Sequence, residues 1–194
     1  MKTSIKIQSV KAFIAILLAS IIFPLATFAL EVKPKKLHTI TNVKKISIKG
    51  NVQVILVQRL SEGITYTDDN YGTAIVSQEG ALLRITGKTQ EVSKLFVYVN
   101  DIFRIEADGN AVVKTEGKLN TKFLQIFLKG NAQADINTNT QGLYTVIEGN
   151  TNLKLTGYTD NHTLQMGKEQ KLTAYDFVAL NTNVIPTEVL AINK

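Results

Sequence analysis

The chain has 194 residues, of which 44% are apolar and 20% charged, and its formal net charge is +6 at pH 7. This length and composition suit one well-packed core and exclude a disordered or fibrous protein. Because the chain has no cysteine, disulfide scaffolds, thiol nucleophiles, iron–sulfur clusters and a lipoprotein anchor are excluded too. Its two histidines, His38 and His162, are too few for a His-rich metal centre.

The first 29 residues have the pattern of a secretory signal. Three lysines precede an apolar run over residues 12–29, which ends in Thr27-Phe28-Ala29. A basic start, an apolar stretch and small residues at the exit predict a signal peptide over residues 1–29. A membrane anchor is the alternative, because the run approaches the length that spans a bilayer. We therefore expect an exported protein of the periplasm, cell surface or extracellular space, with no transmembrane span in the mature chain.

A short basic tail is expected next, over residues 30–39. It contains Lys33, Lys35 and Lys36, and a basic segment could indicate a nucleic-acid partner. The sequence shows no nucleic-acid-binding module, so a solvated or surface-associating stretch is the preferred interpretation and no nucleic acid is expected.

Residues 40–194 are predicted to form a single all-β domain. Apolar and polar residues alternate with a period of two in short runs such as Ile46-Ser47-Ile48 and Leu83-Arg84-Ile85, which is typical of strands with one buried face. Turn-forming residues separate these runs, and no helical stripe follows residue 30.

Four Gly-Asn pairs mark a repeat along these strands. They are Gly50-Asn51, Gly109-Asn110, Gly130-Asn131 and Gly149-Asn150, and the last three are 21 and 19 residues apart. Positions two and four residues to either side are mostly apolar or small, so the units are expected to stack in register as coils of a parallel β-helix. Glycine and asparagine tolerate the left-handed backbone of tight corners. An antiparallel sandwich with Gly-Asn hairpins is the alternative.

Charged residues at two positions of the repeat alternate in sign. One residue before the glycine stand Asp108, Lys129 and Glu148, and five residues after it stand Lys114, Asp135 and Lys154. Parallel stacking in register would place the members of each set about 4.8 Å apart, with opposite charges adjacent.

The sequence resembles the head GIN domain family, described as putative auto-transporter adhesins. The resemblance rests on residues 43–58, on Gly80–Ile85, on Leu95–Val99 and on the Gly-Asn units, and it covers about residues 40–185. It implies a right-handed parallel β-helix-like solenoid, on which we expect an N-terminal strand-rich portion to pack, and an adhesin role. The sequence departs from the family pattern in having Gly-Asn where Ser and Gly are common, and in lacking a glycine-rich closing segment.

No catalytic, cofactor-binding or metal-binding residue is predicted. The acidic residues are scattered over different positions of the repeat, whereas a glycosidase needs a carboxylate pair. Asp135 stands where a calcium-binding repeat would have a ligand, but Lys114 and Lys154 occupy the equivalent neighbouring positions and would repel the ion.

A candidate binding face consists of Phe127, Tyr144 and Val146. Side chains alternate between the two faces of a strand, and this alternation places the three apolar side chains on the outer face, where polar residues are usual. A sugar ring or a partner surface could pack on them. The alternative is that Leu95, Val97 and Val99 cover this face as a second core.

The preferred hypothesis is a non-enzymatic, adhesin-like binding module whose partner is a cell-surface glycan or an envelope protein. An enzyme acting on polysaccharide and a self-associating structural envelope protein are the alternatives.

Overall fold

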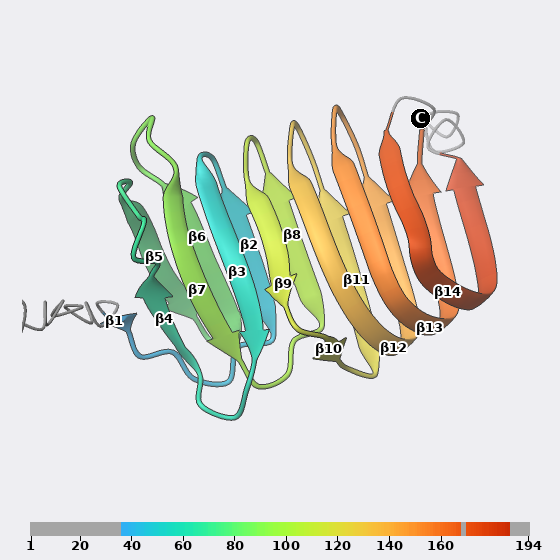
Figure 1. Cartoon of the computed structure of the whole chain (residues 1–194), viewed down its shortest axis with the longest axis horizontal. Coiled ribbons are helices and arrows are strands. Elements are labelled where there is room, and N and C mark those ends of the chain that lie inside the picture. The colour runs from blue at the N-terminus through green and yellow to red at the C-terminus, as the bar shows by residue number, and fades with distance from the viewer. Residues whose placement is uncertain (1–35, 168–169, 187–194) are drawn as a thin grey trace, which may run out of the picture. The chain divides into compact units, whose positions relative to one another are not determined.

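The structure is a computed structural model that describes residues 36–167 and 170–186, and these form strands and no helix (Figure 1). The strands are β1 (Lys36–His38), β2 (Lys45–Lys49), β3 (Val52–Gln58), β4 (Gly63–Tyr66), β5 (Ala74–Glu79), β6 (Leu82–Gly87), β7 (Ser93–Val99), β8 (Arg104–Asp108), β9 (Val112–Glu116), β10 (Leu119–Asn120), β11 (Phe123–Leu128), β12 (Gln133–Ile147), β13 (Asn152–Met166) and β14 (Lys171–Pro186). The all-β prediction is confirmed. The predicted signal peptide lies outside the described residues, as does most of the basic tail.

The strands form one curled, mixed sheet, a half-barrel, and the predicted right-handed parallel β-helix solenoid is wrong. The order is β1-β4-β7-β3-β9-β12-β11-β8-β2-β6-β5, while β13 and β14 extend the sheet from β12 and β10 pairs with β12. The pairs β1–β4, β4–β7 and β5–β6 are antiparallel, and the remaining pairs are parallel. The N-terminal strands lie within this sheet, so the expectation that they pack on it as a separate portion is also wrong.

The error arises because alternation reports which way a side chain points and not which strand lies next to which. Strands β2 and β3 flank the first Gly-Asn corner in the chain, yet β2 lies between β6 and β8, and β3 between β7 and β9. A solenoid would place its first coil at one end. Strands of similar apolar composition bury their inward side chains equally well whichever of them are neighbours in the sheet.

The core lies inside the curl and is built from the inward columns of the sheet. One column runs through Leu83, Ile46, Ile105, Ile126, Thr145 and Leu164 on adjacent strands, and all six side chains are buried. Burying an aliphatic side chain of this size contributes about 1.5–3 kcal/mol to the free energy of folding. Burial of these columns inside the sheet is therefore the main force that favours its curled shape.

The corners between the strands stack on one another. The four corner glycines, at 50, 109, 130 and 149, have φ values of 76°, 71°, 69° and 79°. The asparagines of the first three corners form a ladder, because Asn110 Nδ2 donates to Asn51 Oδ1 at 3.1 Å and Asn131 Nδ2 donates to Asn110 Oδ1 at 3.2 Å. A left-handed backbone at each corner lets the chain reverse while the next strand stays in register.

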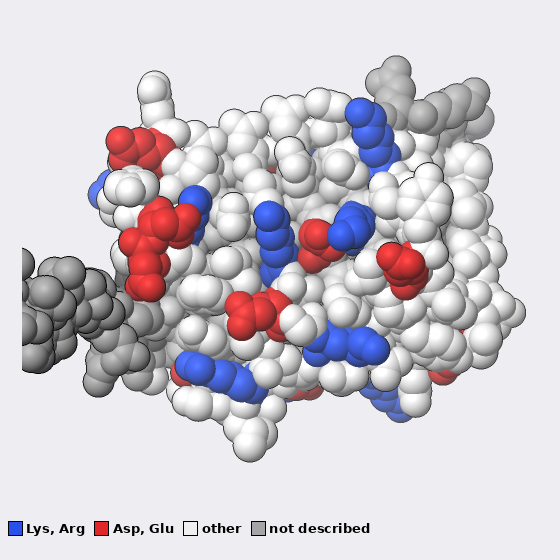
Figure 2. All heavy atoms as spheres, in the orientation of Figure 1, with Lys and Arg blue, Asp and Glu red and all other residues white. Residues whose placement is uncertain are grey.

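In each predicted set of alternating charges, one pair of opposite charges meets as an ion pair. Asp135 pairs in register with Lys114 and Lys154, and its Oδ2 lies 3.1 Å from Lys154 Nζ. In the other set, just before the corner glycines, Lys129 Nζ lies 3.2 Å from Glu148 Oε2. Acidic and basic side chains are interspersed over the face that carries β9, β12 and β13 (Figure 2).

Replacing Asp135 with Asn is expected to change the free energy of unfolding by no more than about 0.5 kcal/mol, because exposed ion pairs contribute little. Both side chains of the Asp135–Lys154 pair are about half exposed. Urea unfolding at low and high salt measures the change, with Lys154→Gln as the matched variant. A loss above about 1.5 kcal/mol in either variant would show that the pair stabilises the sheet and does more than align it.

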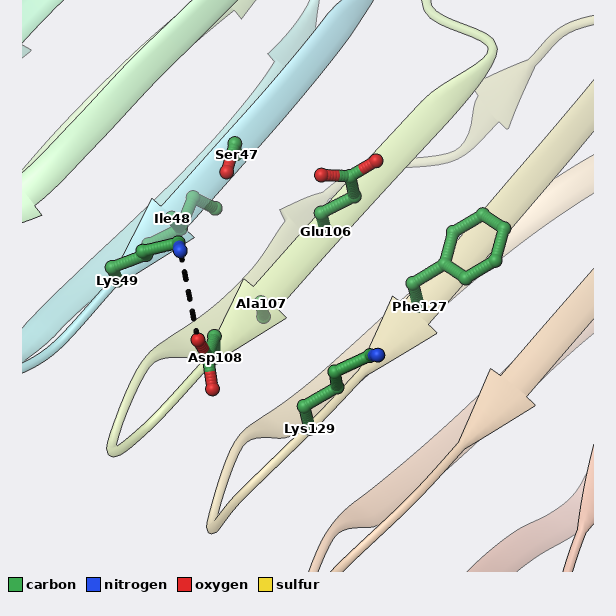
Figure 3. A pocket seen from close by; sticks show the side chains of 8 residues that line it. All are labelled: Ser47, Ile48, Lys49, Glu106, Ala107, Asp108, Phe127 and Lys129. Carbon is green, nitrogen blue, oxygen red and sulfur yellow. Dashed lines mark ion pairs between the residues drawn. The ribbon is translucent and has the colours of Figure 1, made fainter.

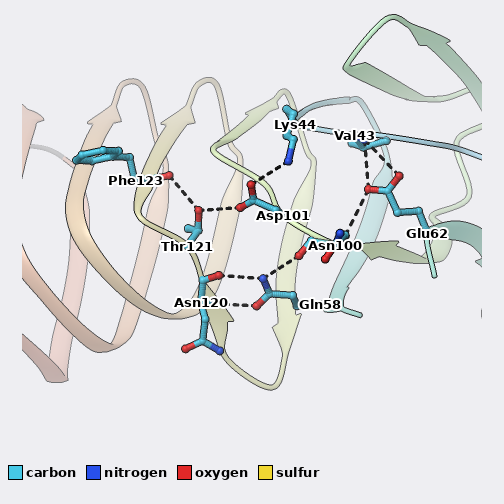
Figure 4. A network of polar contacts seen from close by, with 9 residues as sticks. All are labelled: Val43, Lys44, Gln58, Glu62, Asn100, Asp101, Asn120, Thr121 and Phe123. Atoms are coloured by element: carbon cyan, nitrogen blue, oxygen red, sulfur yellow. Dashed lines mark hydrogen bonds and ion pairs between the residues drawn. The ribbon is translucent and has the colours of Figure 1, made fainter. Parts of the chain in front are cut away.

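A polar network ties together the loops at the far ends of the strands (Figure 4). Gln58 Nε2 donates to the carbonyl oxygens of Asn100 and Asn120, both at 2.9 Å, and Gln58 Oε1 accepts from the Asn120 N–H at 2.7 Å. Lys44 Nζ lies 2.8 Å from Asp101 Oδ2, and this hydrogen bond, with a smaller effect from the Thr121 hydroxyl, lowers the pKa of Asp101. The network thus links the segments that precede β2, follow β7 and follow β10.

Candidate functional site

The predicted face lies on the outer side of β8, β11 and β12. In β11 the inward residues Leu124, Ile126 and Leu128 are buried, whereas Phe127 points outward and is half-buried. Its register partners are Glu106 on β8 and Val146 on β12. The strict alternation of β11 therefore places an aromatic ring on the solvent side of the sheet.

Phe127, Tyr144 and Arg104 form a contact group that we call the outer aromatic cluster. The ring centroids of Phe127 and Tyr144 are 5.9 Å apart and their planes are tilted by 58°. The Arg104 guanidinium carbon lies 4.9 Å from the Phe127 centroid, within the range of a cation–π interaction.

Hydrogen bonds fix the rim of this cluster. Arg104 Nε donates to Gln125 Oε1 at 2.8 Å, and the Tyr144 hydroxyl donates to Gln165 Oε1 at 3.1 Å. Side chains held in this way lose little conformational entropy when a partner binds. The cluster is thus pre-organised on a rigid sheet.

The three predicted residues differ in how far a partner could reach them. Phe127 and Tyr144 are half-buried, so each keeps part of its ring exposed, whereas Val146 is only 6% exposed. Val146 lies beside Phe127 on the neighbouring strand but offers almost no contact surface. Leu95, Val97 and Val99 are fully buried in the main core, so the three residues named as a cover contribute to that core instead.

A hollow of about 340 Å³ adjoins the cluster (Figure 3). Outward side chains around it are Ser47, Lys49, Glu106, Asp108, Phe127 and Lys129. Lys49 Nζ lies 3.8 Å from Asp108 Oδ2, and Phe127 forms one side of the hollow. Hydrogen-bond donors, acceptors and one aromatic face together match the needs of a sugar ring, which has polar hydroxyls around an apolar face.

Two carboxylates line this hollow, which raises the question of hydrolysis. Glu106 is paired with Arg104, at 3.3 Å, and Asp108 with Lys49, and all four side chains are substantially exposed. A glycosidase encloses one carboxyl in apolar surroundings so that it keeps a proton to donate. Neither carboxylate here has such an enclosure, so the arrangement suits binding better than acid catalysis.

A second outward aromatic group was missed by the sequence analysis. On β7, the rings of Phe96 and Tyr98 are 6.1 Å apart with planes 14° from parallel, and the Arg59 guanidinium carbon lies 3.3 Å from the Tyr98 centroid. Alternation assigns Leu95, Val97 and Val99 to one face of this strand and so leaves Phe96 and Tyr98 on the other, but the two rings were not considered as a site. The neighbouring Lys94, which shares the parity of Phe96, was the signal that could have identified the outward side.

The described part of the chain offers little for metal or membrane chemistry. It contains no group of three or more His, Asp or Glu side chains that could hold a metal ion. No helix within it is both long and apolar enough to cross a membrane. His162 is buried, lies 2.9 Å from Thr145 Oγ1 through Nε2 and packs edge-on against Phe177, so it is a core residue.

Comparison with known proteins adds a family match and several similar folds. Residues 42–185 match the family described as "Putative auto-transporter adhesin, head GIN domain". No curated protein matches the chain.

Three solved structures illustrate the similarity in fold. A putative adhesin from Bacteroides fragilis NCTC 9343 is 17% identical, with a TM-score of 0.63 over 77% of this chain and 75% of that one. A putative adhesin from Parabacteroides merdae ATCC 43184 is 16% identical, with a TM-score of 0.55 over 78% and 76%. A putative lipid binding protein from Parabacteroides distasonis ATCC 8503 is 12% identical, with a TM-score of 0.55 over 80% and 79%.

Proposed function

Since the chain belongs to the head GIN domain family of putative auto-transporter adhesins, we propose that it is an exported, non-enzymatic binding protein of the cell envelope that recognises a glycan or a surface partner. The outer aromatic cluster beside its hollow is the single observation that carries this proposal. Phe127 and Tyr144 present ring surface on a rigid sheet, and paired charges surround them.

The chemistry of the cluster favours a neutral sugar over a charged ligand. Lys49 and Lys129 approach the hollow together with Glu106 and Asp108, so cations and anions balance there. A sugar stacks its C–H face on an aromatic ring, and its hydroxyls exchange hydrogen bonds with mixed donors and acceptors. An anionic or cationic ligand would meet as many repelling as attracting groups.

Binding of the purified chain to an array of surface glycans and envelope proteins tests the proposal. We expect the double variant Phe127→Ser/Tyr144→Ser to bind at least about 30-fold more weakly than the wild type, since two aromatic contacts of this kind contribute about 2 kcal/mol or more. Both residues are half-buried, so the variant should remain folded with a modest loss of stability.

The matched control is Phe96→Ser/Tyr98→Ser, which removes two half-buried aromatic rings from the other outward group. It should retain wild-type binding. If the control loses binding and the first variant keeps it, the binding face lies on β7 and not on β11 and β12. If the wild type binds nothing on the array, or if it releases reducing sugar in a way that Glu106→Gln abolishes, the non-enzymatic binding role is wrong.

A further inference from the structure

The last described strand, β14, has an unpaired outer edge. It is sixteen residues long and pairs in parallel with β13, and within residues 36–167 and 170–186 no strand pairs with its other side. Tyr175, Val178, Leu180 and Val184 on this strand are exposed, Tyr175 by 96%. A long edge strand with apolar side chains is a template for pairing with another chain.

The core itself is open at this end. Val184 continues the inward column of Leu164, but Val184 is 54% exposed whereas Leu164 is 4% exposed. Leu172 continues the column of Leu153 and is likewise only half-buried. Side chains that face the interior of the sheet thus meet solvent, because the described chain places nothing beyond them.

The opposite end of the sheet is closed by the chain's own strands. Antiparallel β4 and β5 lie there, with Ile64 and Ala74 buried. The Ala74 N–H donates to the Tyr66 hydroxyl at 3.1 Å and links the two segments. One end of the sheet is thus covered by the chain's own strands, whereas the end at β14 is exposed. This difference indicates that β14 has a role beyond that of an ordinary edge strand.

Strand β14 has little of the usual protection of an edge, apart from one bulge at Ala174 and Tyr175, where two of its residues face a single residue of β13. Natural edge strands are blunted by lysines, prolines or bulges that prevent pairing. Here the only charged residues are Lys171, the first residue of the strand, and Asp176, and the only proline is Pro186 at its end. Fourteen residues between these ends are therefore free of lysine and proline.

We propose that β14 is the interface for a second copy of this chain, whose β14 pairs with it edge to edge and antiparallel. Identical edges related by a two-fold axis run antiparallel. With the overlap centred on Val178 and Ala179, between the bulges of the two copies, Phe177 lies opposite Leu180 and Asp176 faces Asn181. At this centre apolar residues meet apolar residues, and no two like charges are opposed.

The length of β14 fits a specific interface. Sixteen residues of strand have a contour length of about 53 Å along the curl. A strip of that length, with the open core end that it encloses, approaches the roughly 800 Å² per partner of a stable complex. The two half-barrels would share one continuous sheet, and their exposed core columns would cover each other. This interface is independent of the proposed binding face on β11 and β12.

Sedimentation of the full chain over a range of concentrations tests this interface. The wild type should form dimers, and Val178→Asp/Leu180→Asp should shift the dissociation constant upward by at least about 100-fold, because each copy then brings two like charges to the other. The matched control is Leu60→Asp/Tyr71→Asp, which changes two apolar residues that are even more exposed and lie away from β14. The control should associate as the wild type does.

Hydrogen exchange on the wild type provides a second measurement that does not depend on how well a variant folds. Amides on the outer edge of β14 should be protected in concentrated solution and should lose protection on dilution. A monomeric wild type, equal association of both double variants, or protection that dilution does not change would overturn the proposal. The last result would indicate instead that residues 187–194 cover the edge within one chain.

Discussion

Replacing Gly157 with Ala should lower the free energy of unfolding by roughly 3–5 kcal/mol, combining backbone strain with forced overlap. Gly157 lies in the middle of β13 with φ at +101°, a backbone conformation that residues with a side chain rarely adopt. A Cβ atom at this position would lie 2.1 Å from the carbonyl oxygen of Thr138 on β12. The substitution must therefore move one of two paired strands.

The matched control for this variant is Gly80→Ala. Gly80 has φ at +55°, and a Cβ atom there meets nothing within 4 Å, so the change adds backbone strain without overlap, at a cost of about 1 kcal/mol. Thermal unfolding measures both variants, with about 2–4 °C expected per kcal/mol for a domain of this size. Equal melting temperatures for the two variants would contradict the close approach of β12 and β13.

Stability should also fall as the pH drops below about 6.5, because of His162. Burial lowers the pKa of His162 from its ordinary value of 6.5. The unfolded chain then binds a proton at a higher pH than the folded chain does. The free energy of unfolding is therefore unaffected well above pH 6.5 and decreases as the pH falls from there toward the folded pKa, by at most about 1.4 kcal/mol per pH unit.

Urea unfolding from about pH 7 to about pH 5.5 measures this slope. His162→Gln should remove most of it, while His38→Gln, which changes the other histidine of the chain, should leave it unchanged. The pKa of Asp101 is lowered from 3.8, so the stability that Asp101 contributes is lost only at lower pH and does not overlap this window. A slope that persists in His162→Gln would show that His162 does not carry the pH dependence.

Local features of the fold were predictable from the sequence because they depend on near neighbours. Alternation identified inward residues such as Ile46 and Ile126, which are fully buried, and the charge pattern predicted the Asp135–Lys154 pair. The recognised family is confirmed by the match over residues 42–185. The alternation of side chains, the turn residues and the opposite charges each depend on residues that lie within about 20 positions of one another in the sequence.

The order of the strands was not predictable in the same way. It depends on which of several similar apolar edges meet, and residues far apart in the chain decide that. The length of the later strands was not predictable either, since β12 continues from Gln133 to Ile147 without a break. Threonines there, Thr138 and Thr140, are buried, so a polar stretch that looks like a loop is part of a curled strand.

The candidate site, like the strand order, could be predicted from the sequence only in part. Parity placed Phe127 and Tyr144 on the outer side of the sheet, but the degree to which neighbours cover them could not be read from the sequence. Gln165 and Arg104, which contact the two rings, come from β13 and β8. Side chains from four strands set the exposure of the cluster, and only the assembled sheet brings them together.

Hydroxyl-radical footprinting of the purified chain, with and without the tightest-binding molecule from the array, tests the binding face most directly. Aromatic side chains react readily with the radical, and the chain carries them on separate surfaces. We expect the bound molecule to protect Phe127 and Tyr144 while Phe96, Tyr98 and Tyr175 react as before. Protection confined to Phe96 and Tyr98, or to Tyr175 on β14, would contradict the assignment of the binding face to the outer aromatic cluster.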